Sequence, residues 1–282
     1  MVGSTTLLSA AILGGVSLTF ALLIAIANKK LRVWEDPRVN AVTDMLPGSN
    51  CGACGAAGCR AFAEELIVGQ REPAQCTQLG GDDVVEVANY LGVDAGEAVK
   101  RVARLLCAGG SNVTVRYAEY CGVQTCGAAA AVAAGGKGCA WACLGLADCE
   151  RVCDYDAIFM NEHDLPVVIP DRCTACGDCV EGCPRDLFVI MPTEQKIIVQ
   201  CRSLLEGDEA DSLCKVACNG CGLCATDAAP ELIQIVDGLA VVDYELNERA
   251  DHKAITRCPT GAIAWVEAEQ FSKEPVLIGS ER

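Results

Sequence analysis

The sequence contains little histidine, few aromatic residues and no excess of positive charge. Only two of its 282 residues are histidines, which leaves little for a haem, a Rieske centre or a histidine-rich zinc site. Aromatic residues make up 5% of the chain, so small domains held by cysteine chemistry are favoured over one large apolar core. The net charge of −16 excludes a nucleic-acid-binding protein that relies on phosphate contacts.

Motifs that bind nucleotides are also missing. The segment Gly135–Gly138 (GGKG) resembles the end of a phosphate-binding loop, but that loop requires glycine at Ala131 and serine or threonine at Gly138. No G-x-G-x-x-G motif follows an expected strand, so no nicotinamide or flavin site of the Rossmann type is predicted. The chain therefore carries no complete active site of its own.

Charged residues are absent from the N-terminal segment, Met1 to Asn28. Within it, Leu7–Ala27 is almost purely apolar or small, and as a helix it would span about 30 Å, the thickness of a bilayer core. The basic residues Lys29, Lys30 and Arg32 follow. The positive-inside rule predicts a single-pass anchor in the cytoplasmic (inner) membrane, with the N-terminus outside and the remainder in the cytoplasm. A cleaved signal peptide is disfavoured because no positive residue precedes the apolar run.

Cysteine is unusually abundant, with 21 copies. An odd number argues against a closed disulfide framework, and a reducing cytoplasm favours metal binding by clustered cysteines. The first group is Cys51-x2-Cys54-x4-Cys59, with Cys76 further on, in a loop rich in glycine and alanine. Zinc is the alternative metal, but zinc ribbons pair two C-x2-C knuckles, so this spacing favours a [4Fe–4S] cluster. A short amphipathic helix is expected over Arg60–Val68.

The second group contains the run that is typical of bacterial ferredoxins. In Cys173-x2-Cys176-x2-Cys179-x3-Cys183, followed by proline, three cysteines hold one cluster and the fourth ligates another. A partner run lies upstream, with Leu146 where its middle cysteine is expected. We assume that Cys139 supplies the missing ligand. The crossed assignment then places one cluster on Cys139, Cys143, Cys149 and Cys183, and the other on Cys153, Cys173, Cys176 and Cys179.

The third group repeats this pattern incompletely. A three-cysteine loop is intact, and Cys258 precedes a proline at the distal position. The second set of this repeat is lost, because its four positions are occupied by Ala228, Glu248, Asp251 and Ala254. One cluster is therefore predicted here, on Cys218, Cys221, Cys224 and Cys258.

Short apolar runs accompany each cysteine motif. Four follow the motifs, at residues 157–160, 187–190, 232–235 and 262–266, and two more lie at 166–169 and 240–242. The pattern predicts a single transmembrane helix followed by small α+β iron–sulfur domains: a C-x2-C-x4-C [4Fe–4S] domain and two tandem dicluster-ferredoxin-like βαββαβ units. Helical periodicity over Asp82–Leu106 predicts a helix that packs on the first cluster domain.

The expected domain boundaries follow from these motifs. They are an anchor over 1–28, a [4Fe–4S] domain over 29–100, a helical linker over 101–136, a dicluster ferredoxin-like domain over 137–192, a second ferredoxin-like domain with one lost site over 193–268, and a disordered tail over 269–282.

Five cysteines remain outside these sets: Cys107, Cys121, Cys126, Cys201 and Cys214. One interpretation is that they are buried structural thiols, since free cysteine is among the most buried residue types. The other is that four of them complete a further cluster, although their spacing alone is not diagnostic. The sequence thus predicts four or five [4Fe–4S] clusters.

The order of motifs, and the segment LPGSNCGACGAAGCRAFAEE above all, resembles the B subunits of the Rnf complex, in their long form. The resemblance extends to about residue 267. It implies a membrane-anchored iron–sulfur subunit of an ion-translocating ferredoxin:NAD oxidoreductase. The implied electron donor is reduced ferredoxin or flavodoxin, and the implied coupling ion is Na⁺ or H⁺. Electron flow in the reverse direction, from NADH to ferredoxin, is equally compatible with the resemblance. The implied partners are the membrane and the other Rnf subunits (A, C, D, E and G).

This sequence departs from the family pattern in two places. It lacks the last three-cysteine loop, and Cys76 begins CTQLGG where the family tends to have Cys-Pro-x-Gly-Gly. The alternative function is that of an iron–sulfur subunit in another membrane reductase, including one that reduces a redox-sensing transcription factor.

Overall fold

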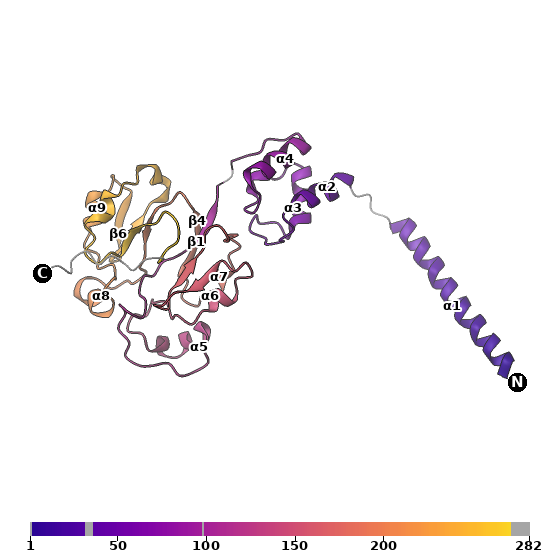
Figure 1. The fold of residues 1–282 in the computed structure, drawn as a ribbon, viewed down its shortest axis with the longest axis horizontal. Coiled ribbons are helices and arrows are strands. Elements are labelled where there is room, and N and C mark those ends of the chain that lie inside the picture. Colours follow the sequence, from indigo (N-terminus) through magenta and orange to yellow (C-terminus); the bar gives the residue numbers. More distant parts are fainter. Residues whose placement is uncertain (1, 32–35, 98, 272–282) are drawn as a thin grey trace.

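The computed structural model describes residues 2–31, 36–97 and 99–271. Its first element is the helix α1 (Val2–Leu31), which lies apart from the other elements (Figure 1). The stretch Ile12–Lys30 is long and apolar enough to cross a membrane, and none of it is buried against the rest of the protein. The predicted N-terminal apolar helix is therefore confirmed. Most of the tail over 269–282 lies outside the described residues.

A small helical domain with its own apolar core follows. Its elements are α2 (Pro37–Met45), α3 (Cys59–Ile67), the 3-10 helix η1 (Pro73–Gln75) and α4 (Gly81–Leu91). Asp36 caps α2 by accepting a hydrogen bond from the backbone N–H of Arg38 over 2.9 Å. Three helices contribute the fully buried side chains Val42, Phe62 and Val87 to the core. Helix α3 confirms the short amphipathic helix that the sequence predicts.

The first unit, residues 101–192, has its main elements in the order βαββαβ. They are β1 (Arg101–Leu105), α6 (Asp148–Arg151), β2 (Ile158–Met160), β3 (Pro166–Val168), α7 (Asp178–Glu181) and β4 (Phe188–Pro192). Strand β1 pairs antiparallel with β4, so that Leu105 lies opposite Phe188, and β2 pairs with β3. A long segment between β1 and α6 contains α5 (Cys126–Ala131) and the 3-10 helix η2 (Ala133–Gly136).

The second unit, residues 197–265, repeats this order. Its elements are β5 (Ile197–Val199), α9 (Leu223–Asp227), β6 (Ile233–Val236), β7 (Leu239–Val242), α10 (Lys253–Thr256) and β8 (Ile263–Trp265). Strand β5 pairs with β8, and β6 with β7. Two further helices interrupt it, α8 (Gly207–Leu213) and the 3-10 helix η3 (Tyr244–Arg249). The strands expected after each cysteine motif are confirmed in both units.

The helix predicted over Asp82–Leu106 is only partly present, and the helical linker predicted from residue 101 is wrong at its start. Helix α4 ends at Leu91, because Gly92 adopts a left-handed conformation with φ 67°. Residues 101–105 form β1 instead. Its last four residues are buried, since pairing with β4 carries them into the core of the first unit. Local periodicity could not reveal a strand whose partner lies so far along the chain.

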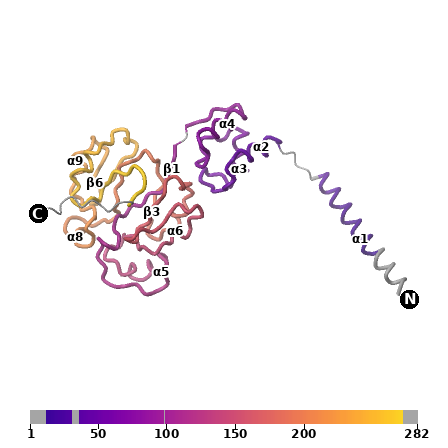
Figure 2. Tube along the Cα trace, in the orientation of Figure 1, coloured from indigo at the N-terminus to yellow at the C-terminus, as the bar shows by residue number. Residues whose placement is uncertain are grey.

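The two units lie side by side (Figure 2). Hydrogen bonds join the segment after β1 to the second unit: Ala108 N–H donates to the Gln200 carbonyl over 2.9 Å, and Lys215 N–H to the Val113 carbonyl over 3.1 Å. The helical domain contacts the first unit through the Thr77 hydroxyl, which donates to the carbonyl of Thr174 over 2.8 Å. These contacts place the cysteine groups of the three parts next to one another.

Candidate iron–sulfur sites

All 21 cysteines lie in the described residues, and none forms a disulfide. Nor do three or more His, Cys, Asp or Glu side chains of the described residues converge closely enough for a single metal ion. A [4Fe–4S] cube is larger than one ion and is held by four thiolates that surround it. The relevant test is therefore whether four cysteines line one cavity.

The cysteines of the helical domain gather at the start of α3. Cys54, Cys59 and Cys76 pack against the same apolar core, and the Asn50 side chain accepts a hydrogen bond from Cys59 N–H over 2.9 Å. Burial raises the pKa of Cys76, and the nearby thiols of Cys54 and Cys51 raise it further. The four predicted ligands thus lie together, with the chemistry that iron–sulfur clusters require.

The first cavity of the first unit is lined by the same four cysteines as one of the predicted ligand sets. Cys153, Cys173, Cys176 and Cys179 line about 310 Å³ of space. Gly177 precedes α7 with φ 98°, a conformation that turns the loop back towards the cavity. Burial raises the pKa of Cys179 to about 12, and Cys173 and Cys176 contribute. Positively charged iron would be needed to hold such thiols as thiolates.

The second cavity of the first unit is lined by a set of cysteines that differs from the predicted set at one position. It has an empty volume of about 320 Å³, open in part to solvent, and is lined by Cys126, Cys143, Cys149 and Cys183. Cys139 is not among its lining residues, and Cys126 takes the place that we assigned to it. The reason is a tertiary contact at the start of α5: Gly127 N–H donates to the Asp148 carboxylate over 3.0 Å, which brings Cys126 beside α6.

The cavity of the second unit holds the predicted four cysteines. Cys218, Cys221, Cys224 and Cys258 line about 340 Å³. A two-pronged ion pair between Arg257 and Asp227, with both N–O distances 2.6 Å, links the Cys258 segment to α9. At the lost set, Ala228 and Ala254 pack into the apolar core. Side chains thus fill the space where a cluster would lie.

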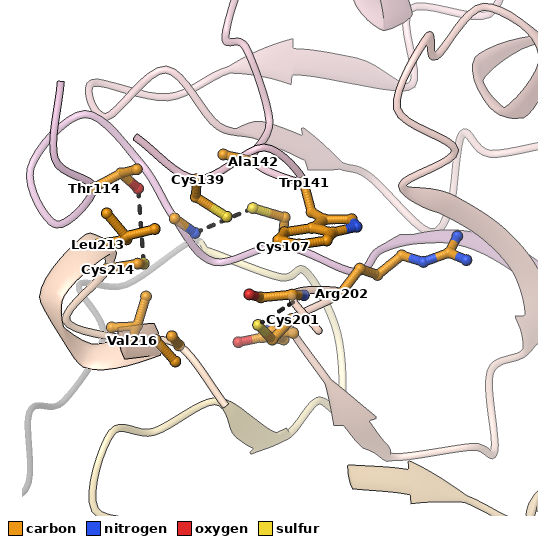
Figure 3. Close-up of a pocket in the computed structure, with 15 residues that line it drawn as sticks. Cys107, Thr114, Cys139, Trp141, Ala142, Cys201, Arg202, Leu213, Cys214 and Val216 are labelled. Carbon is orange, nitrogen blue, oxygen red and sulfur yellow. Dashed lines mark hydrogen bonds between the residues drawn. The ribbon is translucent and has the colours of Figure 1, made fainter. Parts of the chain in front are cut away.

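A further cavity lies between the two units, and the sequence assigned no cluster to it. It encloses about 390 Å³ and is lined by Cys107, Cys139, Cys201 and Cys214 (Figure 3). Burial raises the pKa of Cys201 to about 12. Burial also raises the pKa of Cys139, while the positive charge of Lys137 opposes this effect. Of the 21 cysteines, only the exposed Cys121 lies outside these five groups.

Two family models match the chain over parts of this geometry. A putative Fe–S cluster model matches residues 46–78, which contain the cysteines of the helical domain. A 4Fe–4S binding domain model matches residues 166–188, which contain the ferredoxin run of the first unit. Iron–sulfur chemistry is thus indicated independently for two of the five groups.

Similarity over the whole chain identifies the family. The chain is 38% identical over 253 residues to the B subunit of the Na⁺-translocating ferredoxin:NAD⁺ oxidoreductase complex of Acetobacterium woodii, a match that covers 90% of this chain and 76% of that relative. It belongs to the family of Rnf complex B subunits. Rnf B subunits of other organisms agree: that of the proton-translocating ferredoxin:NAD⁺ oxidoreductase complex of Clostridium ljungdahlii is 35% identical over 94% of this chain and 95% of its own length.

An archaeal Rnf relative shows the same extent of similarity. The B subunit of the ion-translocating oxidoreductase complex of Methanosarcina acetivorans is 33% identical over 90% of this chain and 96% of its own length. The aligned portions of these Rnf B subunits therefore extend well beyond the two segments that the family models match.

Proposed function

We propose that this chain is the electron relay of an ion-translocating ferredoxin:NAD oxidoreductase complex. In that role it accepts electrons from a reduced ferredoxin or flavodoxin and passes them towards subunits that carry the NAD site. The observation that carries the proposal is the placement of the cysteine groups, which adjoin one another from the helical domain to the second unit.

Four of the groups are proposed as [4Fe–4S] sites on the basis of family similarity and ligand pattern. Their ligands are Cys51, Cys54, Cys59 and Cys76; Cys153, Cys173, Cys176 and Cys179; Cys126, Cys143, Cys149 and Cys183; and Cys218, Cys221, Cys224 and Cys258. Bound there, the clusters supply one-electron carriers, and the protein tunes them through burial, charge and hydrogen bonds to sulfur. On this basis, both units are of the dicluster ferredoxin type, and the second has lost one site.

Contacts between groups support a continuous path. The Thr77 hydroxyl, next to Cys76, donates to the carbonyl of Thr174, which lines the first cavity of the first unit. Tyr155 lines that cavity. Burial raises the pKa of Tyr155, and the nearby thiols of Cys51 and Cys176, one from each group, raise it further. Within the first unit, Cys149 lies near the start of α6 and Cys153 follows its C-terminal end, and the two line different cavities.

The helix α1 is proposed to hold this relay at the membrane. Its apolar stretch is long enough to cross a bilayer, and Lys29 and Lys30 follow at its C-terminal end. The positive-inside rule supports a cytoplasmic location for the cysteine groups. A soluble ferredoxin would then reach them from the cytoplasm, while the other Rnf subunits bind the nucleotide and move the coupling ion.

The proposal is tested on the whole complex, purified without oxygen. Chemically reduced ferredoxin is mixed with the complex, and the iron–sulfur EPR signals of this chain are followed by rapid freezing before NAD⁺ is added. We expect these signals to appear before NADH forms and to decay when NAD⁺ is supplied. NADH formation without any reduction of this chain would contradict the proposal. Adding NADH and oxidised ferredoxin tests the reverse direction in the same way.

A further inference from the structure

We propose that Cys107, Cys139, Cys201 and Cys214 bind a fifth [4Fe–4S] cluster, which joins the relay of the first unit to that of the second. The relay role rests on the proposed function. The binding site rests on the geometry between the two units.

The four cysteines occupy equivalent positions in the two repeats. Cys107 lies two residues beyond the end of β1, and Cys201 lies two residues beyond the end of β5. Cys139 lies four residues before Cys143, and Cys214 lies four residues before Cys218. Each unit therefore contributes the same pair of positions, as expected for a site on a pseudo-two-fold axis between repeats.

The cavity resembles the three cavities within the units in size and in its four cysteines. Its volume of about 390 Å³ compares with about 310, 320 and 340 Å³ for the three cavities within the units. Cys107, Cys139 and Cys214 are buried, and Cys201 is half-buried. Figure 3 shows all four thiols around this space. A zinc ion alone would need its ligands to converge, which no such group in the described residues does.

Hydrogen-bond donors surround the sulfurs. Gly109 N–H donates to Cys107 Sγ over 3.4 Å, Ser203 N–H to Cys201 Sγ over 3.5 Å, and the Thr114 hydroxyl to Cys214 Sγ over 3.7 Å. Such bonds stabilise thiolates and tune cluster potentials. A Cβ at Gly109 would lie 2.7 Å from the Thr114 hydroxyl, so only glycine permits this close approach of the backbone.

A buried lysine supplies the positive charge that the cluster would need. Lys137 is 5% exposed, and its ammonium group donates to the carbonyl of Gly109 over 3.2 Å. No carboxylate in the described residues forms an ion pair with it. Burying an ammonium group without a negative partner costs free energy of folding. Four thiolates around a 2+ core carry a net charge of about −2, which Lys137 partly neutralises, and ligation releases the four thiol protons.

The site contacts both of its neighbours directly. Cys143, a proposed ligand of the first unit, donates its backbone N–H to Cys107 Sγ over 3.4 Å. Cys218, a proposed ligand of the second unit, lies close enough for its backbone N–H to lower the pKa of the Cys201 thiol, which burial raises. An electron taken up at this site could therefore be given back on either side, with no net oxidation or reduction of the protein.

The test is a count of iron, sulfide and zinc in the full-length chain purified without oxygen. We expect about 20 iron atoms per chain, four for each of five clusters, and about five spins by EPR after complete reduction. About 16 iron atoms, or one zinc with 16 iron atoms, would overturn the proposal. This measurement does not depend on whether any variant folds.

Variants locate the fifth cluster. Cys214→Ala and Cys107→Ala should each lose about four iron atoms, and the double variant should lose no more than either one. The control is Cys121→Ala, which should keep all of its iron because that exposed thiol belongs to none of the five cysteine groups. Full iron in both single variants would contradict the proposal. A protein with 16 iron atoms that still accepts electrons from ferredoxin would overturn this site and leave the proposed function intact.

Discussion

The backbone N–H of Cys143 donates a hydrogen bond to Cys107 Sγ over 3.4 Å. The two residues line different cavities, one inside the first unit and one between the units. The two cavities therefore share part of a wall. A change of charge at one of them alters the electrostatic environment of the other, because both cysteines are buried and buried charges are screened less than exposed ones.

The lining of the second cavity of the first unit differs from the predicted ligand set in one residue, with Cys126 in place of Cys139. We expect Cys126→Ala to lose about four iron atoms, because its thiol lines the cavity of Cys143, Cys149 and Cys183. Iron analysis and EPR of the purified chain measure the loss, with the exposed Cys121→Ala as control.

Double variants separate the two cavities. Cys126→Ala combined with Cys183→Ala should lose no more iron than Cys126→Ala alone, because both thiols serve one cluster. Cys126→Ala combined with Cys139→Ala should lose about eight iron atoms. Full iron in Cys126→Ala, or a loss of about eight iron atoms when it is combined with Cys183→Ala, would contradict the placement of Cys126 at this cavity.

The single cluster of the second unit should depend on Cys258. This thiol completes the cavity of the three-cysteine loop, so Cys258→Ala should lose about four iron atoms and one EPR signal. Cys214 lines the cavity between the units, and Cys214→Ala should remove a different signal. If both variants lose the same signal, the two cavities do not hold separate clusters.

The charge of Lys137 should raise the reduction potential of the cluster between the units. Replacing this buried lysine by methionine removes a positive charge that favours the reduced state. We expect Lys137→Met to lower that potential by on the order of 50 mV, roughly 1 kcal/mol for one electron. An EPR-monitored redox titration measures the shift.

Lys215→Met is the matched control for this potential. Lys215 follows Cys214 in the chain but is exposed, so solvent screens its charge and the shift should be much smaller. Equal shifts in the two variants would show that Lys137 acts only through the overall charge.

Deleting residues 1–31 should release the protein from the membrane. Helix α1 is the single element of the described residues that is long and apolar enough to span a bilayer, and its apolar stretch packs against nothing else. The truncated protein should be soluble, brown and sensitive to oxygen, with unchanged iron content. Fractionation of cells that express it alone gives the measurement, and retention in the membrane fraction would contradict the role of α1 as sole anchor.

Much of the architecture was predictable because it depends on local spacing. The ferredoxin run from Cys173 to Cys183 brings three thiols to one cavity through a single turn of chain, so its geometry is contained in the sequence itself. The apolar runs that became β2, β4, β6 and β8 were visible for the same reason. The loss of one set in the second unit also followed from counting, since alanine and carboxylate side chains stand where thiols would be.

The remaining features depend on contacts between residues that are distant in sequence. The sequence pattern of β1 predicts the end of a helix, and the segment is a strand because it pairs with β4. Cys126 reaches the first unit only because the start of α5 contacts Asp148. The four thiols between the units have no diagnostic spacing, because the two chain segments that supply them meet only when the repeats pack together. The sequence alone indicated the apolar helix, the family and three of the cysteine groups, whereas tertiary packing placed Cys126 in the fourth group and created the cavity between the units.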